Sequence, residues 1–321
     1  MPTPLVRCES LSALGGVEVD LKRDDLIGDQ LTGTKMRALS YIVWQAKEDG
    51  VSDLITIGEP TSNQCRLVSM LGARHGMTTH VLLRKSACYG DQEDDNLTIM
   101  RMHGARVQFL EEDEWRLHGM TAKRLMSRVR KAGGKALFVP FGCGGLPGAL
   151  GIIDLVREIV AQHGGRCPYQ HIVVPTGSGA TLFALDLAMQ VLDLDPDTVP
   201  MLLGVSVARD APGLLQQIDK LYAQVRPTLG ATLQRTDRLT IDDRWTDHGP
   251  ARQLEELQRV VGTYGLLPDP LYVLRAVLAL ERLISSGELA SSSRVLLLVT
   301  GACRTLHATR QRATETRHAT Q

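Results

Sequence analysis

The chain has 321 residues, and its 36 basic and 36 acidic side chains give a formal net charge of zero. This balance supplies no electrostatic attraction for nucleic acid or for an anionic membrane, so neither is expected as a partner. Apolar residues make up 43% of the chain, but no apolar run reaches the roughly 20 residues that cross a bilayer. The first four residues lack the basic and apolar regions of a signal peptide. We therefore expect a cytoplasmic enzyme that acts on a small molecule.

Short strand-like runs alternate along the chain with longer amphipathic stretches, which indicates βαβ units around mostly parallel sheets. The expected strands are residues 54–57, 79–83, 106–110, 136–139, 171–174, 201–207 and 294–299. Apolar residues at a spacing of three and four predict helices over residues 36–46 and 254–261. The sequence therefore predicts an α/β protein.

Two stretches are typical of domain junctions, the turn at residues 50–52 and the glycine-rich segment at residues 142–148. We expect a large domain of residues 1–50 and 145–303 and a small domain of residues 51–144. Residues 304–321 lose the apolar periodicity and are expected to form a polar, disordered tail. The six cysteines contain no C-x-x-C pair, so neither a metal site nor a redox dithiol is indicated.

The first candidate site is Lys35, which follows a Gly33-Thr34 turn at the start of an expected helix. The positive end of the helix dipole and partial burial both lower the pKa of a lysine. A neutral amine is what Schiff-base chemistry requires. A solvated residue in the first helical turn is the alternative interpretation, because most lysines are exposed.

The second candidate is the polar loop that follows the strand ending near Gly58 and leads into a helix near Asn63. Side chains in such a loop face the crevice in which α/β sheets bind ligands. Ser62 and Asn63 are also preferred helix N-caps, so an ordinary cap is the alternative. Cys65, in the first turn of this helix, is expected to pack there, because no activating neighbour is evident.

The third and fourth candidates follow two buried strands. The strand at residues 171–174 leads into a glycine-rich turn that reads Gly177, Ser178, Gly179, Ala180 and Thr181. Backbone N–H groups of such a turn can cradle a phosphate, although the spacing fits neither a Walker A motif nor a dinucleotide fingerprint. A structural strand-to-helix turn is the alternative. Thr300 ends the last strand, where it caps the strand or presents its hydroxyl to a heterocyclic nitrogen.

Taken together and in this order, the four motifs resemble the aminocyclopropane-carboxylate deaminase and D-cysteine desulfhydrase family of pyridoxal-phosphate enzymes. The resemblance covers roughly residues 20–303. It implies the two-domain fold type II of these enzymes, which is tryptophan synthase β-like. Each domain is then a mostly parallel twisted sheet flanked by helices. It also implies pyridoxal 5′-phosphate as the cofactor, a small amino acid as the substrate and a homodimer as the assembly.

The resemblance assigns a role to each matching residue. Lys35 matches the lysine that holds the cofactor as an internal aldimine and moves protons at the substrate's α or β carbon. Asn63 matches the residue that hydrogen-bonds the pyridine 3′-oxygen, and with Ser62 and Gln64 it belongs to the loop that binds the substrate carboxylate. The turn at residues 177–181 matches the phosphate cradle, and Thr300 matches the threonine that contacts the pyridine nitrogen.

The chain also departs from the family pattern. The family's Gly-Tyr-Gly is replaced by Asp247-His248-Gly249, so His248 stands where a tyrosine lies over the substrate. A histidine there could act as acid or base near neutral pH. Tyr272 matches the tyrosine of a Tyr-x-Gly-Lys motif, and Val273 stands where the deaminases carry a glutamate. The candidate catalytic residues are therefore Lys35, Ser62, His248 and Tyr272.

We expect a lyase that catalyses α,β-elimination on a small amino acid such as cysteine or another β-substituted alanine. The products would be pyruvate, ammonia and the leaving group. The neutral hydroxyl of Thr300 suits this chemistry, because a weak electron sink suffices when the carbanion expels a leaving group at once. A β-replacement enzyme and a ring-opening deaminase are alternatives, the second disfavoured by Val273. A non-catalytic cofactor- or ligand-binding homologue and a nucleotide-binding dehydrogenase are alternatives of other classes.

Overall fold

The computed structural model describes residues 2–28, 32–85, 95–192, 194–246 and 250–301. The chain divides into two compact units. The large unit consists of Met1–Arg37 and Ala149–Gln321, and the small unit of Ala38–Gly148. The expected boundaries at residues 50 and 144 differ from these. Helix α2 (Lys35–Glu48) was expected to belong to the large unit, but from Ala38 onward it packs within the small one.

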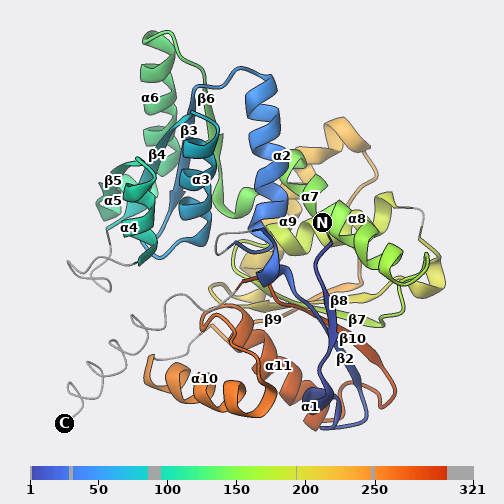
Figure 1. Cartoon of the computed structure of the whole chain (residues 1–321). Helices are drawn as coiled ribbons and strands as arrows, with labels where there is room; N and C mark the ends of the chain where they lie inside the picture. The colour runs from blue at the N-terminus through green and yellow to red at the C-terminus, as the bar shows by residue number, and fades with distance from the viewer. Residues whose placement is uncertain (1, 29–31, 86–94, 193, 247–249, 302–321) are drawn as a thin grey trace. The chain divides into compact units, whose positions relative to one another are not determined.

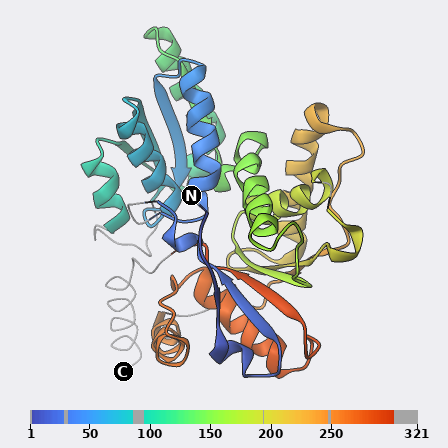
Figure 2. The ribbon, with the colours of Figure 1, turned by 45° about the vertical axis from the view of Figure 1, so that its right-hand side comes forward.

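The large unit is built on a six-stranded sheet in the order β1-β2-β10-β7-β8-β9. All neighbouring strands are parallel except β1 and β2, and Figure 2 shows β2 and β10 running side by side in dark blue and red. The strands are β1 (Leu5–Arg7), β2 (Glu18–Lys22), β7 (His171–Thr176), β8 (Met201–Ser206), β9 (Leu239–Asp242) and β10 (Arg294–Leu298). This confirms the three strands that were predicted here and adds β1, β2 and β9.

Helices cover both faces of this sheet, with α1, α10 and α11 on one side and α7, α8 and α9 on the other (Figure 1). They are α1 (Glu9–Ser12), α7 (Leu146–Gln162), α8 (Ala180–Val191), α9 (Ala211–Leu229), α10 (Pro250–Tyr264) and α11 (Val273–Ser285). Two short 3₁₀ turns complete the unit: η1 (Asp24–Leu26) follows β2, and η4 (Pro196–Thr198) lies between α8 and β8. Helix α11 is buried along its first eight residues, because it packs over the centre of the sheet. The predicted α/β class is confirmed.

The small unit has a four-stranded, fully parallel sheet in the order β5-β4-β3-β6. Its strands are β3 (Asp53–Gly58), β4 (Thr78–Arg84), β5 (Arg106–Leu110) and β6 (Ala136–Val139), all four at predicted positions. Its helices are α2, α3 (Asn63–Arg74), α4 (Asp95–Met102), α5 (Glu112–Arg116), α6 (His118–Lys131) and the 3₁₀ turn η3 (Phe141–Cys143). Alternate residues of β4 enter different cores, Val81 and Leu83 on one face and Leu82 on the other.

A buried network of charges lies within the large unit. The guanidinium of Arg37 donates to both oxygens of Asp24, at 2.9 and 2.8 Å, and to both oxygens of Glu158, at 2.8 and 3.1 Å. Lys22 also donates to Glu158. Two cations therefore face two anions, so the network is balanced in charge.

Lys22 is fully buried, and burial lowers the pKa of its ammonium group. Its Nζ nevertheless donates to three acceptors, namely the Thr3 carbonyl at 2.9 Å, Gln162 Oε1 at 2.7 Å and Glu158 Oε1. A neutral amine has only two N–H groups, so three acceptors require the protonated form. We therefore treat Lys22 as charged at neutral pH.

Glu158 is expected to make the stability of the protein depend on acid pH. Burial works to raise the pKa of this carboxyl, but hydrogen bonds from Arg37 and Lys22 outweigh it and lower the pKa from 4.5 to about 2. The contribution to stability is therefore complete above pH 4.5 and is lost as the pH falls toward 2. The shift corresponds to about 3 kcal/mol.

The check is the free energy of unfolding of the wild type and of Glu158→Gln between pH 7 and about pH 2.5. The difference between the two proteins should shrink as the pH falls below 4.5. A difference that stays constant across this range would show that Glu158 does not carry the effect.

Candidate functional site

The carboxyl edge of the large sheet collects the predicted site residues of that unit. Strands β7 and β10 are parallel neighbours, so their carboxyl ends lie side by side. Strand β7 ends at Thr176, directly before the glycine-rich turn, and β10 ends two residues before Thr300. In open α/β sheets ligands bind outside this edge. The predicted phosphate turn and Thr300 therefore lie on adjacent strands at the edge where a ligand is expected.

Lys35 is tied to the same edge through the residues before it. Gly33 forms an antiparallel bridge with Gly301, and the Thr34 N–H donates to the Thr300 carbonyl at 3.0 Å. A Cβ on Gly33 would lie only 2.3 Å from the Thr300 oxygen, so this approach requires glycine. Lys35 is the next residue and begins α2. The residue before the lysine is thus bonded to Thr300, and the role of Lys35 stays a prediction.

The turn at residues 177–181 leads directly into the N-terminus of α8. Gly179 caps α8 with a φ of +79°, a left-handed conformation that favours glycine. Its N–H donates to Thr176 Oγ1 at 3.2 Å, and the Ala180 N–H lies 3.4 Å from Ser178 Oγ. The positive end of the dipole of this 12-residue helix points at the turn. A phosphate group is the natural occupant of such a place.

Tyr272 contacts the same turn from α11. A Cβ on Gly177 would lie 3.3 Å from both Cε1 and the hydroxyl oxygen of Tyr272, so the ring lies directly against the turn. Asp269 fixes the backbone there, because its Oδ1 accepts the N–H of Tyr272 at 2.7 Å. Arg275 stands where the family has a lysine, and it donates to the Val207 carbonyl at 2.7 Å. The altered motif therefore keeps its tyrosine close to the phosphate turn.

In the small unit, Ser62 and Asn63 follow the carboxyl end of β3. Ser62 caps α3, and its Oγ accepts the Cys65 N–H at 3.2 Å. Asn96 of α4 is 1% exposed and donates to the Thr61 carbonyl at 2.7 Å and to Asn63 Oδ1 at 3.4 Å. Asn96 therefore holds both the loop at Thr61 and the side chain of Asn63 in place. No sequence pattern pointed to Asn96, because a lone asparagine in a helix matches no motif.

Gln64 and Cys65 point into the small unit. The Gln64 amide donates to the Pro140 carbonyl at 2.7 Å and to Thr56 Oγ1 at 3.3 Å, which ties α3 to the end of β6. A role for Gln64 in substrate binding stays a prediction. Cys65 is fully buried, and burial raises the pKa of its thiol to about 12. It is therefore a neutral packing residue, as expected.

Several predicted features lie outside the described residues. They are His248, Cys88, Cys303 and the tail at residues 304–321, and the roles proposed for them stay predictions.

The described cysteines, Cys8, Cys65, Cys143 and Cys167, are free thiols. Within the ranges that the structure covers, no cluster of three or more histidine, cysteine or acidic side chains is arranged to hold a metal ion. None of the described helices combines the length and the apolar character that crossing a membrane requires.

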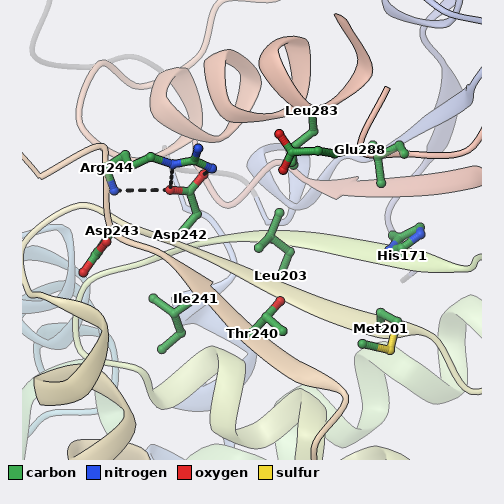
Figure 3. A pocket seen from close by; sticks show the side chains of 11 residues that line it. His171, Met201, Leu203, Thr240, Ile241, Asp242, Asp243, Arg244, Leu283 and Glu288 are labelled. Carbon is green, nitrogen blue, oxygen red and sulfur yellow. Dashed lines mark hydrogen bonds and ion pairs between the residues drawn. The ribbon is translucent and has the colours of Figure 1, made fainter. Parts of the chain in front are cut away.

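A cavity of about 530 Å³ lies elsewhere in the large unit (Figure 3). Its lining comes from β7, β8, β9 and the end of α11, and consists of His171, Met201, Leu203, Thr240, Ile241, Asp242, Asp243, Arg244, Leu283, Glu288 and Leu289. The lining runs from His171 and Met201, which begin β7 and β8, to Asp242, which ends β9, and it contains none of the predicted site residues. Charged side chains in the lining already form ion pairs, because Arg244 pairs with Asp242 and Glu288 pairs with Arg282. It is separate from the candidate site.

The residues at the carboxyl edge fit pyridoxal 5′-phosphate by their chemistry. Lys35 offers a primary amine for an aldehyde, and Thr300 places a hydroxyl on the adjacent strand end. The turn at residues 177–181 offers a helix N-terminus for a phosphate. Glycine at position 179 is required by its positive φ and by packing against α9, because a Cβ there would lie 3.0 Å from Ile218. Together they define a parallel α/β enzyme that binds a phosphorylated aldehyde cofactor.

Comparison with known proteins agrees with this class. The chain belongs to the family of pyridoxal-phosphate dependent enzymes, which it matches over residues 1–301. The D-cysteine desulfhydrase of Yersinia pestis (strain Pestoides F) is 27% identical over 321 residues, which cover 95% of this chain and 93% of that protein. The mitochondrial bifunctional D-cysteine desulfhydrase/1-aminocyclopropane-1-carboxylate deaminase of Arabidopsis thaliana is 27% identical over 314 residues, 93% of this chain and 75% of that protein.

The fold is also that of a solved structure. The crystal structure of an ACC deaminase homologue superimposes with a TM-score of 0.85 at 24% identity, and the match covers 98% of this chain and 94% of that one. The family and this neighbour confirm the predicted fold type II and the predicted cofactor.

Proposed function

We propose that this protein is a pyridoxal-phosphate-dependent lyase that catalyses α,β-elimination on a small amino acid. The substrate is cysteine, in particular D-cysteine, or another β-substituted alanine, and the products are pyruvate, ammonia and the leaving group. The observation that carries the proposal is the link from Lys35 through Thr34 to Thr300, beside the turn at residues 177–181. The names of the D-cysteine desulfhydrase relatives support the substrate class.

Each proposed contact with the cofactor has a matching residue. Lys35 would hold its aldehyde carbon, the turn at residues 177–181 its phosphate, Thr300 its ring nitrogen and Asn63 its 3′-oxygen. The bound cofactor supplies the electron sink that makes loss of a proton from the substrate's α carbon feasible. Lys35 accepts that proton, and a neutral amine at a helix N-terminus is a suitable base.

The remaining site residues act on the substrate. We propose that Ser62, Asn63 and Gln64 bind its carboxylate at the start of α3, where the helix dipole favours a negative charge. The ring of Tyr272, which lies against Gly177, would shield this side of the site from water. His248 would serve as the acid that protonates the leaving group.

Elimination is favoured over ring opening of 1-aminocyclopropane-1-carboxylate by the residue at position 273. Val273 is fully buried at the start of α11, and an apolar side chain can neither give nor take a proton. A glutamate stands at this position in deaminases of the family. The chain therefore lacks the carboxylate that the resemblance links to ring opening.

We also propose that the enzyme is a homodimer located in the cytoplasm. The family resemblance supports the dimer. Light scattering should give a mass twice the 35.1 kDa of the chain. A mass of one chain would contradict the dimer.

The experiment is a substrate screen on protein loaded with pyridoxal 5′-phosphate. Pyruvate and sulfide are measured with D-cysteine and L-cysteine, pyruvate with β-chloroalanine, and 2-oxobutanoate with 1-aminocyclopropane-1-carboxylate. We expect pyruvate from at least one β-substituted alanine and no 2-oxobutanoate. A second thiol in the assay detects β-replacement, because it would yield a new thioether amino acid in place of pyruvate. Cofactor binding without any turnover would identify a binding protein instead.

A further inference from the structure

The turn that carries Lys35 is held on both sides by one buried carboxylate. Asp24 is 0% exposed. Its Oδ2 accepts the Thr34 hydroxyl at 3.0 Å and the Arg37 Nε at 2.9 Å. Thr34 precedes the lysine directly, and Arg37 follows it by two residues. Asp24 therefore holds the side chains of two residues that flank Lys35, one before it and one after it.

Asp24 is itself fixed from several directions. It begins the 3₁₀ turn η1, and its Oδ1 accepts the Thr3 hydroxyl at 2.9 Å and a second N–H of Arg37 at 2.8 Å. Arg37 is held in turn by Glu158, and Glu158 by Lys22. Because every member of this network has a charged or hydrogen-bonded partner, the carboxylate has little freedom to move.

Thr34 is held through its backbone as well as through its side chain. The Thr34 N–H is bonded to the Thr300 carbonyl while its hydroxyl is bonded to Asp24. These two bonds fix the Gly33–Thr34 peptide and the Thr34 side chain, and the Arg37 ion pair fixes the first turn of α2. A helix start that is held at both places presents its side chain in one direction, which is what attack on an aldehyde carbon requires.

We propose that Asp24 is a positioning residue, which aims the Lys35 amine at the cofactor through Thr34 and Arg37. This inference rests on the proposed role of Lys35. Asp24 does not touch the reacting atoms, and it acts only by fixing the residues on either side of the lysine.

Two threonines provide a matched test. Thr34 and Thr3 are 2% and 3% exposed, and each donates its hydroxyl to Asp24. Thr34→Val and Thr3→Val therefore remove the same kind of bond from the same carboxylate and leave its charges in place. Thr3→Val removes further contacts, with Arg37 and Glu158, so its effect on stability should be at least as large. Only Thr34 is a neighbour of Lys35 in the chain.

The primary readout is the rate at which pyridoxal 5′-phosphate becomes covalently attached to the cofactor-free protein, followed by borohydride trapping and peptide mass spectrometry. We expect Thr34→Val to slow attachment at Lys35 about tenfold, and Thr3→Val to change it less than about twofold. Thr34→Ser keeps the hydroxyl and should retain the wild-type rate. Asp24→Asn keeps the shape of the side chain but not its charge, and should also slow attachment.

The possible outcomes separate this inference from the proposed function. If the wild type carries the cofactor on Lys35 and Thr34→Val attaches it as fast as Thr3→Val does, Asp24 does not position the lysine. If Thr34→Val and Thr3→Val slow cofactor attachment to the same extent, the network only stabilises the fold and does not position Lys35. If the wild type carries no cofactor on Lys35, the proposed function fails as well.

Discussion

Replacing Lys35 with alanine should abolish covalent attachment of the cofactor and lower turnover by on the order of 10³-fold or more. Two losses combine in this variant. The aldehyde carbon loses its amine partner, and removal of a positioned base alone typically costs about 10²–10⁴-fold. The measurements are the visible absorbance of protein mixed with pyridoxal 5′-phosphate and the rate of pyruvate formation.

The matched control is Lys47→Ala, because Lys47 is an exposed lysine in the last turn of the same helix. This variant should keep the absorbance and the activity of the wild type. Added methylamine should restore part of the activity of Lys35→Ala, since a free amine can take over the proton transfer. A Lys35→Ala protein with the full activity of the wild type would remove the lysine from the chemistry.

Gly33→Ala should be nearly as damaging, although it adds only one methyl group. The added Cβ would meet the Thr300 carbonyl oxygen at 2.3 Å, and that oxygen belongs to backbone that is hydrogen-bonded to Thr34. Relief requires the Gly33–Gly301 bridge to open, which moves Lys35 away from Thr300. Overpacking of this kind costs about 1–3 kcal/mol of stability. A displacement of about 1 Å at a reacting group can cost 10²-fold in rate.

The control for Gly33→Ala is Gly262→Ala in α10, also in the large unit. Nothing lies within 4 Å of a Cβ at position 262, so alanine should raise stability slightly through its better helix propensity, by about 0.5–1 kcal/mol. Unfolding temperature, affinity for pyridoxal 5′-phosphate and turnover are measured for both variants. If Gly33→Ala binds the cofactor as tightly as Gly262→Ala does, the contact with Thr300 does not shape the site.

The seven strands expected from the sequence are all present, because each is a short apolar run between turn residues. Two of the three strands that were missed share a reason. Strand β2 reads Glu-Val-Asp-Leu-Lys and ends on a buried lysine, and β9 ends on a buried aspartate. Lys22 is buried because it meets Glu158, 136 residues away in the chain. A local pattern cannot show a partner at that distance, so a buried charged strand resembles an exposed segment.

The first domain boundary was expected at residue 50, but the small unit begins at Ala38, for a related reason. The apolar face of α2 predicted a helix correctly, and Ala38, Leu39 and Ile42 are buried. Periodicity shows that a helix has a buried face but not which core that face enters. The junction was therefore expected at the glycine turn after the helix, whereas the small unit begins at Ala38.

The candidate site was predicted in part. Lys35, Thr300 and the turn at residues 177–181 could be found because each follows a turn or a strand end with its own composition. The supporting residues could not be found in this way. Asp24 lies in a motif of charged residues that is typical of an exposed loop, and Asn96 and the contact between Tyr272 and Gly177 exist only in three dimensions.

The most direct test of the central claim is to reduce the wild-type protein with borohydride in the presence of pyridoxal 5′-phosphate and to map the modified peptide by mass spectrometry. We predict a single phosphopyridoxyl group, located on Lys35. Modification of a different lysine, or of none, would contradict the account.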